Sequence, residues 1–139
     1  MWWTWHAFFS GIIAVFYFLF TLDILSTILL FTVGVLIDTD HYIVFKIVKK
    51  GSFSNFYKKF YNIAVKNEDG NDIVKYIVPF HNFEFIIFLF ILSFYIPFFT
   101  SIAIGASSHF VMDVIWIRRF KIKSFYSVTY YIFHRYVRK

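Results

Sequence analysis

Four of the five histidines and four of the eight acidic residues stand in four short groups along the 139-residue chain. Imidazole nitrogens and carboxylate oxygens are good ligands for zinc, manganese and iron. A metal held by them can lower the pKa of a bound water and supply a hydroxide nucleophile, as in metal-dependent phosphoester hydrolysis. The chain has no cysteine, which excludes disulfides and thiolate metal sites. The groups are His6; Asp38, Asp40 and His41; His81 and Glu84; and His109 and Asp113.

Two of these groups have the spacing of neighbours on one helix face. His109 and Asp113 are four positions apart, and His81 and Glu84 are three apart. On a helix, residues so spaced lie about 5–6 Å from each other. Each group taken alone has a simpler explanation, as a helix cap, an interfacial residue or a structural His–carboxylate pair. A common role therefore requires a fold that brings all the groups to one place.

The elements that position these groups are apolar. Hydrophobic residues make up 60% of the chain, and 22 residues are Phe, whereas a soluble domain is roughly 45–50% apolar. The mean hydropathy is +0.66. So short a chain cannot bury this much apolar surface within itself, and lipid must cover part of it. We therefore expect an all-α fold, a polytopic membrane helical bundle that forms a single membrane domain over residues 1–139.

The apolar runs predict two helical hairpins, at 7–37 and 82–117. Asp23 lies at the first tip, where its side chain suits the N-cap of the following helix. Pro97 breaks the second run, because proline disrupts a helix interior. About four short transmembrane helices result, several below the usual ~20 residues. They are Ala7–Leu22, Ile24–Ile37, Asn82–Tyr95 and Phe98–Ile117.

All 14 Lys and Arg residues lie outside the hairpins, in an interfacial segment at 42–78 and a tail at 118–139. Aromatic residues recur at helical spacing from Phe53 onward, which predicts a basic amphipathic helix on the membrane surface. The positive-inside rule places both basic segments and both termini in the cytoplasm, for a multi-pass protein of the cell (inner) membrane. The expected partners are membrane lipids, with anionic head groups near Lys58 and Lys59. No nucleic-acid motif is present, and the oligomeric state is left open.

This topology places all four groups at the cytoplasmic ends of their helices. Ionisable residues at that depth usually face the bundle interior and have a partner. We therefore predict one shared metal centre, with Asp38 or Glu84 as a further ligand or as the general base. The set exceeds the four ligands of one tetrahedral zinc, so one or two divalent ions are expected, zinc first, with manganese or iron as alternatives. The predicted metal ligands are His6, Asp40, His41, His81, His109 and Asp113.

The ordered set resembles the membrane-bound metal-dependent hydrolase family, the YdjM-like inner-membrane proteins, which are distantly similar to zinc-dependent phospholipase C. Many members have a proline where this chain has Ile37, and a second histidine in the third motif, for which Glu84 could substitute. The resemblance implies metal-dependent hydrolysis. The matching motifs are His6 before an apolar helix, Asp38-Thr39-Asp40-His41, His81-Asn82-Phe83-Glu84, and His109 followed by Asp113.

The residues and the resemblance together favour a membrane-embedded metal-dependent hydrolase acting on a lipid or other phosphoester at the cytoplasmic interface. Two other classes stay open. One is a non-enzymatic membrane protein with a structural metal, which docks a partner through its basic face. The other is a small ion or metal transporter, for which the helices offer few polar residues toward the far side: Ser10, Ser26, Thr27, Thr32 and Ser93.

Overall fold

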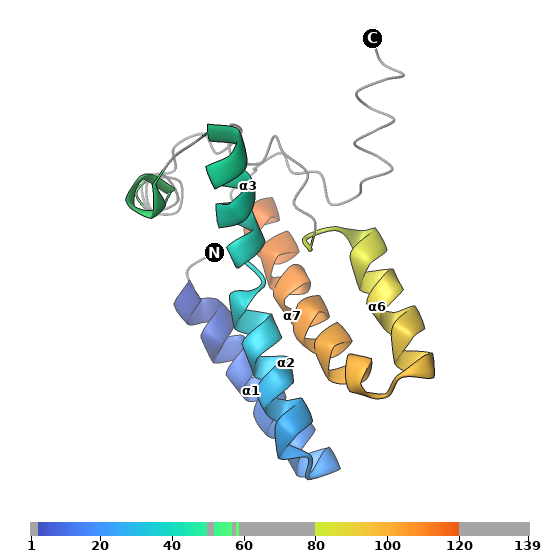
Figure 1. Cartoon of the computed structure of the whole chain (residues 1–139). Coiled ribbons are helices and arrows are strands. Elements are labelled where there is room, and N and C mark those ends of the chain that lie inside the picture. The colour runs from blue at the N-terminus through green and yellow to red at the C-terminus, as the bar shows by residue number, and fades with distance from the viewer. Residues whose placement is uncertain (1–2, 50–51, 57, 59–79, 120–139) are drawn as a thin grey trace.

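The computed structural model describes residues 3–49, 52–56, 58 and 80–119 (Figure 1). Within this part of the chain the secondary structure is helical, with no strand, which confirms the all-α class. Helices occupy all four predicted stretches, and α3 is an additional one. The helices are α1 (Trp3–Thr21), α2 (Ile24–Leu36), α3 (Thr39–Lys49), α6 (Phe83–Tyr95) and α7 (Phe98–Arg119).

Helices α2 and α7 form the centre of the bundle and share its most extensive contact. Helix α1 packs against both of them, and α6 packs against α7 (Figure 1). The turns of the α1–α2 and α6–α7 hairpins lie toward the same end of the molecule, and α3 continues from α2 at the opposite end. The hydrophobic core between them is formed by Ile37, Ile86, Leu89, Ala103 and Ala106.

Two glycines allow α1, α2 and α7 to approach closely. A Cβ atom on Gly105 would lie 2.5 Å from the backbone oxygen of Leu30, so α7 meets the α2 backbone directly. A Cβ atom on Gly34 would collide with the Oγ of Ser10 on α1. Small residues at such crossings let helix backbones pack without intervening side chains, as is common in membrane helices.

Polar caps and a proline set the ends of the hairpin helices. The carboxylate of Asp23 accepts hydrogen bonds from the N–H of Ser26 at 3.1 Å and from its hydroxyl at 2.6 Å. Asp23 is therefore the N-cap of α2, as the sequence predicts. Asn82 caps α6 by accepting from the N–H of Phe85 at 2.7 Å. The break between α6 and α7 falls at Pro97, also as predicted.

Replacing Asp23 by alanine is expected to lower the thermal midpoint of the protein in detergent, while Asp23→Asn retains most of the cap. Hydrogen bonds from Ser26 lower the pKa of the Asp23 carboxyl below its usual range. The cap therefore contributes at neutral pH and is lost as the pH falls through that lowered pKa. The parent should approach Asp23→Ala in acid. Equal midpoints for the alanine and asparagine variants at pH 7 would rule out the cap.

In the part of the chain that the structure describes, two helices are long and apolar enough to cross a membrane, over Thr4–Thr21 in α1 and Phe98–Ile115 in α7. Helices α2 and α3 meet at a bend of 40°, and together they form a third candidate span if the two helices are treated as one membrane crossing. Helix α6 has 13 residues, or about 20 Å of helix, which is less than the ~30 Å hydrocarbon core. The described residues thus contain two or three candidate spans, and the predicted count of about four stays a prediction.

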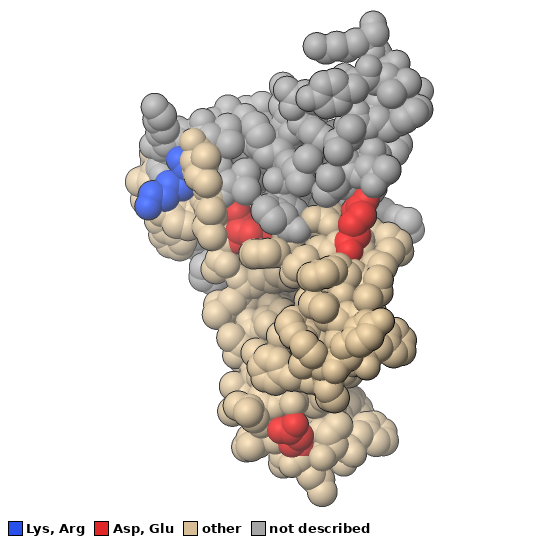
Figure 2. All heavy atoms as spheres, turned by 45° about the vertical axis from the view of Figure 1, so that its right-hand side comes forward, with Lys and Arg blue, Asp and Glu red and all other residues tan. Residues whose placement is uncertain are grey.

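The outer surface of the bundle is apolar. Figure 2 shows a broad band without charged side chains between an acidic residue at one end and charged residues toward the other. Phe20 is 86% exposed and Phe94 is 87% exposed. Such a surface suits lipid rather than water.

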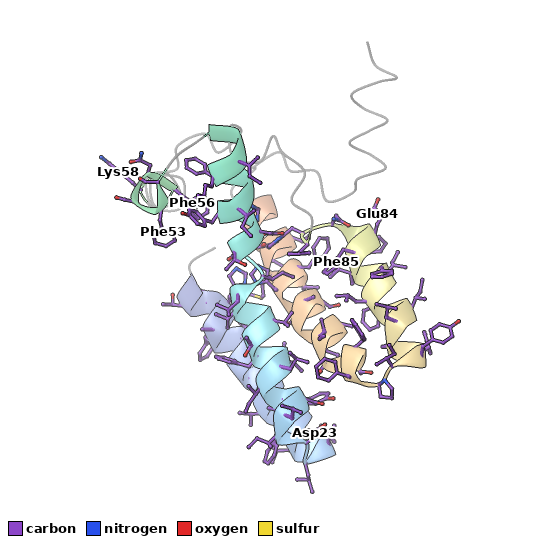
Figure 3. The ribbon with its side chains drawn as sticks, in the orientation of Figure 1. Asp23, Phe53, Phe56, Lys58, Glu84 and Phe85 are labelled. Atoms are coloured by element: carbon purple, nitrogen blue, oxygen red, sulfur yellow. The ribbon has the colours of Figure 1, made fainter. Side chains whose placement is uncertain are left out.

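Helix α3 differs from the sequence-based expectation, which ended the second helix at Ile37 and began an interfacial segment at residue 42. The chain instead turns at Ile37 and Asp38 and resumes as a helix at Thr39. The predicted amphipathic helix beyond Phe53 lies mostly outside the described residues. Among the described residues of this segment, Phe56 is buried (Figure 3), and the centroid of its ring lies 5.6 Å from that of Tyr42.

Candidate metal centre

The structure brings together seven of the eight predicted site residues. They come from the first turns of α1 and α3, the α2–α3 turn, the segment before α6, and the second half of α7. Each lies within 4 Å of another member, between side-chain nitrogen and oxygen atoms. The seven are His6, Asp38, Asp40, His41, His81, His109 and Asp113.

Four ligand atoms form the middle of this cluster. The Nε2 atoms of His81 and His109 are 3.1 Å apart. Oδ1 of Asp38 lies 3.3 Å and 3.2 Å from these two nitrogens, and Oδ2 of Asp113 lies 3.4 Å and 3.3 Å from them. Ligands about 2.0–2.1 Å from a tetrahedral zinc are about 3.3 Å from one another. The five nitrogen–nitrogen and nitrogen–oxygen distances therefore match those of a tetrahedral coordination shell, and we call these four atoms the primary group.

The hydrogen bonds around the two imidazoles turn lone pairs toward the centre. Nδ1 of His109 donates to the backbone oxygen of Gly34 at 2.8 Å, and Nδ1 of His81 donates to Oδ2 of Asp40 at 3.1 Å. A neutral imidazole carries one proton, so Nε2 of each ring is then an acceptor. Together with oxygens of Asp38 and Asp113, four acceptors face one another. In these tautomers, either a proton on one ring or a divalent metal ion satisfies the four acceptors, and nitrogen and oxygen ligands of this kind suit such a metal.

The pKa of His81 reflects the same demand for positive charge. Burial lowers the pKa of its imidazole, but hydrogen bonds with the carboxylates of Asp38 and Asp40 outweigh burial and raise it to about 10. In the absence of a metal, a proton on this ring supplies the cation. A divalent ion would displace that proton, because imidazole binds metals in its neutral form.

The cluster is almost completely shielded from solvent. His109 is 1% exposed and Asp113 is 6% exposed. Among the described residues, the buried Oδ2 of Asp38 has no hydrogen-bond partner, while Oδ1 of Asp40 makes an ion-pair contact with Nδ1 of His81 at 3.1 Å rather than an aligned hydrogen bond. Buried carboxylates are costly unless they are paired or bind a metal, and most buried polar atoms have a partner. The unsatisfied oxygen of Asp38 is compatible with a metal ion in the cluster, which these buried Asp and His side chains could hold.

Asp40 holds His81 in place. Its Oδ2 accepts from the backbone N–H of Phe80 at 2.9 Å as well as from Nδ1 of His81. A carboxylate behind a metal-binding histidine fixes the orientation and tautomer of the ring. Asp40 also belongs to a second group, with His41 and His81, whose ligand atoms lie within 4.8 Å of one another.

Replacing Asp40 by alanine is expected to weaken metal binding by about 10–100-fold without changing the number of bound ions, which is the usual effect of losing such a partner. Asp40→Asn keeps an acceptor oxygen for His81 and should fall between the alanine variant and the parent. Competition with a chromogenic chelator measures these affinities. A change in ion number for Asp40→Ala would instead make Asp40 a direct ligand.

Glu84 is the one predicted site residue that the structure leaves outside the cluster. It lies in the first turn of α6, half-buried, and its side chain points away from α7 (Figure 3). Helix α6 begins at Phe83, after an extended backbone at Asn82. His81 therefore precedes the helix, and the expected shared helix face with Glu84 does not form. An acidic residue in this position interacts favourably with the helix dipole.

One group that orients a histidine of the cluster could not be identified from the sequence. The carbonyl of Gly34, which orients His109, is a backbone atom of α2 and carries no side-chain signal. The only trace in the sequence is the glycine itself, since a small residue marks a close helix approach.

Comparison with models of known protein families, with curated proteins and with solved structures finds no match to this chain. The resemblance to the YdjM-like inner-membrane proteins therefore stays a prediction.

Proposed function

We propose that the protein is a membrane-embedded metal-dependent hydrolase that acts on a lipid or other phosphoester. The observation that carries the proposal is the primary group, in which the Nε2 atoms of His81 and His109 lie 3.1 Å apart and each lies 3.2–3.4 Å from an oxygen of Asp38 and an oxygen of Asp113. A divalent ion at this centre would polarise a phosphoryl oxygen and activate a water molecule. Zinc is our first choice, and manganese and iron suit the same nitrogen and oxygen donors.

The residues take separate roles in this proposal. Asp38 and Asp113 supply charge to the ion, while Asp40 fixes the ring of His81. His41 has the most exposed imidazole of the cluster, 18% against 0–5% for the other three. We assign His41 to the open side of the site, where it meets water and substrate first. In this proposal Asp38 is a metal ligand and not the general base. Glu84 lies outside the cluster, so we assign proton transfer to His41.

The position of the cluster in the bundle favours a lipid substrate. It lies where α1 begins and α2 ends, away from the turn that joins these two helices, and the sides of the bundle expose large apolar residues. In this proposal a head group at the membrane interface is therefore within reach. In this proposal four helices form the membrane domain, both termini are cytoplasmic, and the basic segment at 42–78 attracts anionic head groups. The resemblance to a family of membrane-bound hydrolases points in the same direction.

The proposal is tested with metal-loaded protein in mixed micelles of detergent and phosphatidic acid, phosphatidylglycerol or phosphatidylethanolamine. Phosphorus NMR detects the released phosphate or head-group phosphomonoester. We expect turnover of at least one lipid, its loss with a chelator, and its loss in Asp113→Asn. Turnover that survives both treatments, or no turnover of any phosphoester by protein that holds its metal, would contradict the hydrolase proposal.

A structural metal is the second candidate, and the near-complete burial of the cluster favours it. His6 and His109 are each 1% exposed, which leaves little room for a substrate atom without movement. Such a protein would lose stability on metal removal but hydrolyse nothing, and it would dock a partner through its basic face.

A further inference from the structure

His6 lies against the primary group without belonging to it. Its ring stacks on the ring of His109, with centroids 3.7 Å apart and planes within 8°. Its side chain is 0% exposed. Its Nε2 lies 3.2 Å from Oδ1 of Asp113 and 3.9 Å from Oδ2 of Asp38.

The two carboxylates divide their oxygens between His6 and the primary group. For Asp113, Oδ2 faces His81 and His109, and Oδ1 faces His6. For Asp38, Oδ1 faces the same two rings and Oδ2 is the oxygen nearer to His6. Carboxylates presented in this way can bridge two metal ions.

The polar atoms around the His6 ring lack hydrogen bonds. Among the described residues, Nε2 and Nδ1 of His6 and Oδ2 of Asp38 make no hydrogen bond, although all three are buried. The Nε2 of His6 is close to Oδ1 of Asp113 but is not aligned with it as a hydrogen bond. A buried nitrogen directed at two carboxylate oxygens is the arrangement of an incomplete coordination shell.

We propose that His6, Asp38 and Asp113 hold a second divalent ion beside the one at the primary group. The Nε2 atoms of His6 and His109 each lie 3.2–3.3 Å from a different oxygen of Asp113, which places their coordination positions side by side. The spacing of the stacked rings, 3.7 Å, is similar to the about 3.5–4 Å between ions in two-metal phosphoesterases. The inference rests on the proposed metal centre. With two ions, the site would bind a substrate phosphate group through two phosphate oxygens, one at each ion.

The group of Asp40, His41 and His81 is less suited to the second ion. Nδ1 of His81 already donates its proton to Oδ2 of Asp40. An imidazole that bound ions through both nitrogens would have to lose both protons. The His6 side requires no such loss.

The test counts ions in the full-length chain in detergent, loaded with Mn²⁺ alone and freed of excess. We expect about two ions per chain in the parent and about one in His6→Phe, which keeps a ring stacked on His109 but has no ligand atom. Electron paramagnetic resonance should show exchange-coupled manganese in the parent and isolated ions in His6→Phe. His134→Ala, which alters a histidine of the basic tail, is the control and should match the parent.

Each outcome decides the point. One ion in the parent overturns the second site and leaves the first in place. Two uncoupled ions in the parent, or two ions in His6→Phe, overturn the role of His6. No ion in the parent overturns both the second site and the proposed metal centre. The parent's count and coupling stand on their own if His6→Phe does not fold, as judged by circular dichroism.

Discussion

Asp113→Asn and His109→Ala are expected to abolish tight metal binding. Each removes one of the four donors of the primary group, which should weaken affinity by more than the about 10–100-fold that follows loss of an outer partner. Asp113→Asn keeps the volume of the side chain, so its effect reports charge and coordination rather than a cavity. Elemental mass spectrometry on detergent-purified protein, with circular dichroism to verify the fold, measures the loss.

A matched control lies on the same helix. Ser108 precedes His109, and its hydroxyl donates to the backbone oxygen of Gly105, outside the cluster. Ser108→Ala should bind as much metal as the parent. If Asp113→Asn stays folded and keeps the parent's affinity, Asp113 is not a ligand and the primary group is wrong.

Gly105→Ala is expected to be strongly destabilising. Its Cβ would lie 2.5 Å from the backbone oxygen of Leu30, and backbone cannot move aside as a flexible side chain can. Overpacking of this kind costs about 1–3 kcal/mol, and occasionally more. Because α2 leads to Asp38 and α7 carries His109 and Asp113, forcing these helices apart should also weaken metal binding. Unfolding in detergent, followed by circular dichroism, gives the change in stability.

Gly11→Ala is the control for helix propensity. A Cβ on Gly11 would meet only a ring carbon of Phe31, at 3.8 Å, which is ordinary van der Waals contact. Alanine is a better helix former than glycine by about 0.8–1.0 kcal/mol, so Gly11→Ala should be neutral or stabilising. If Gly105→Ala and Gly11→Ala have the same stability, the close approach of α2 and α7 does not occur.

Most of the helical layout follows from local signals in the sequence. Uninterrupted apolar runs predict helices because lipid or core must cover them. Asp23 and Pro97 divide those runs at the positions where the structure has its turns. The number of spans is harder to predict, since length alone does not decide whether a 13-residue helix such as α6 crosses a bilayer.

Helix α3 shows where local signals mislead. Asp38-Thr39-Asp40-His41 has the composition of a helix end, and a helix does end there. The same residues also begin a new helix, since Thr39 opens α3 and Asp40 lies in its first turn. Polar residues of this kind suit both roles, so composition does not distinguish a stop from a bend.

The membership of the cluster is more predictable than its geometry. Placing helix ends at one level of a bundle is enough to bring His6 near Asp113 and His81 near His109, because topology alone sets that level. The orientation of each ring depends on packing register, which the sequence does not contain. Glu84 illustrates the difference: the backbone is extended at Asn82, so His81 lies before α6 while Glu84 lies within its first turn.

The central claim is that the primary group binds a divalent metal, and X-ray absorption on zinc-loaded parent protein in detergent tests it most directly. We predict stoichiometric zinc with a first shell of nitrogen and oxygen at about 2.0–2.1 Å and an imidazole signature from histidine. A parent that retains no stoichiometric metal after loading with zinc, manganese or iron, or a zinc shell without histidine, would contradict the claim.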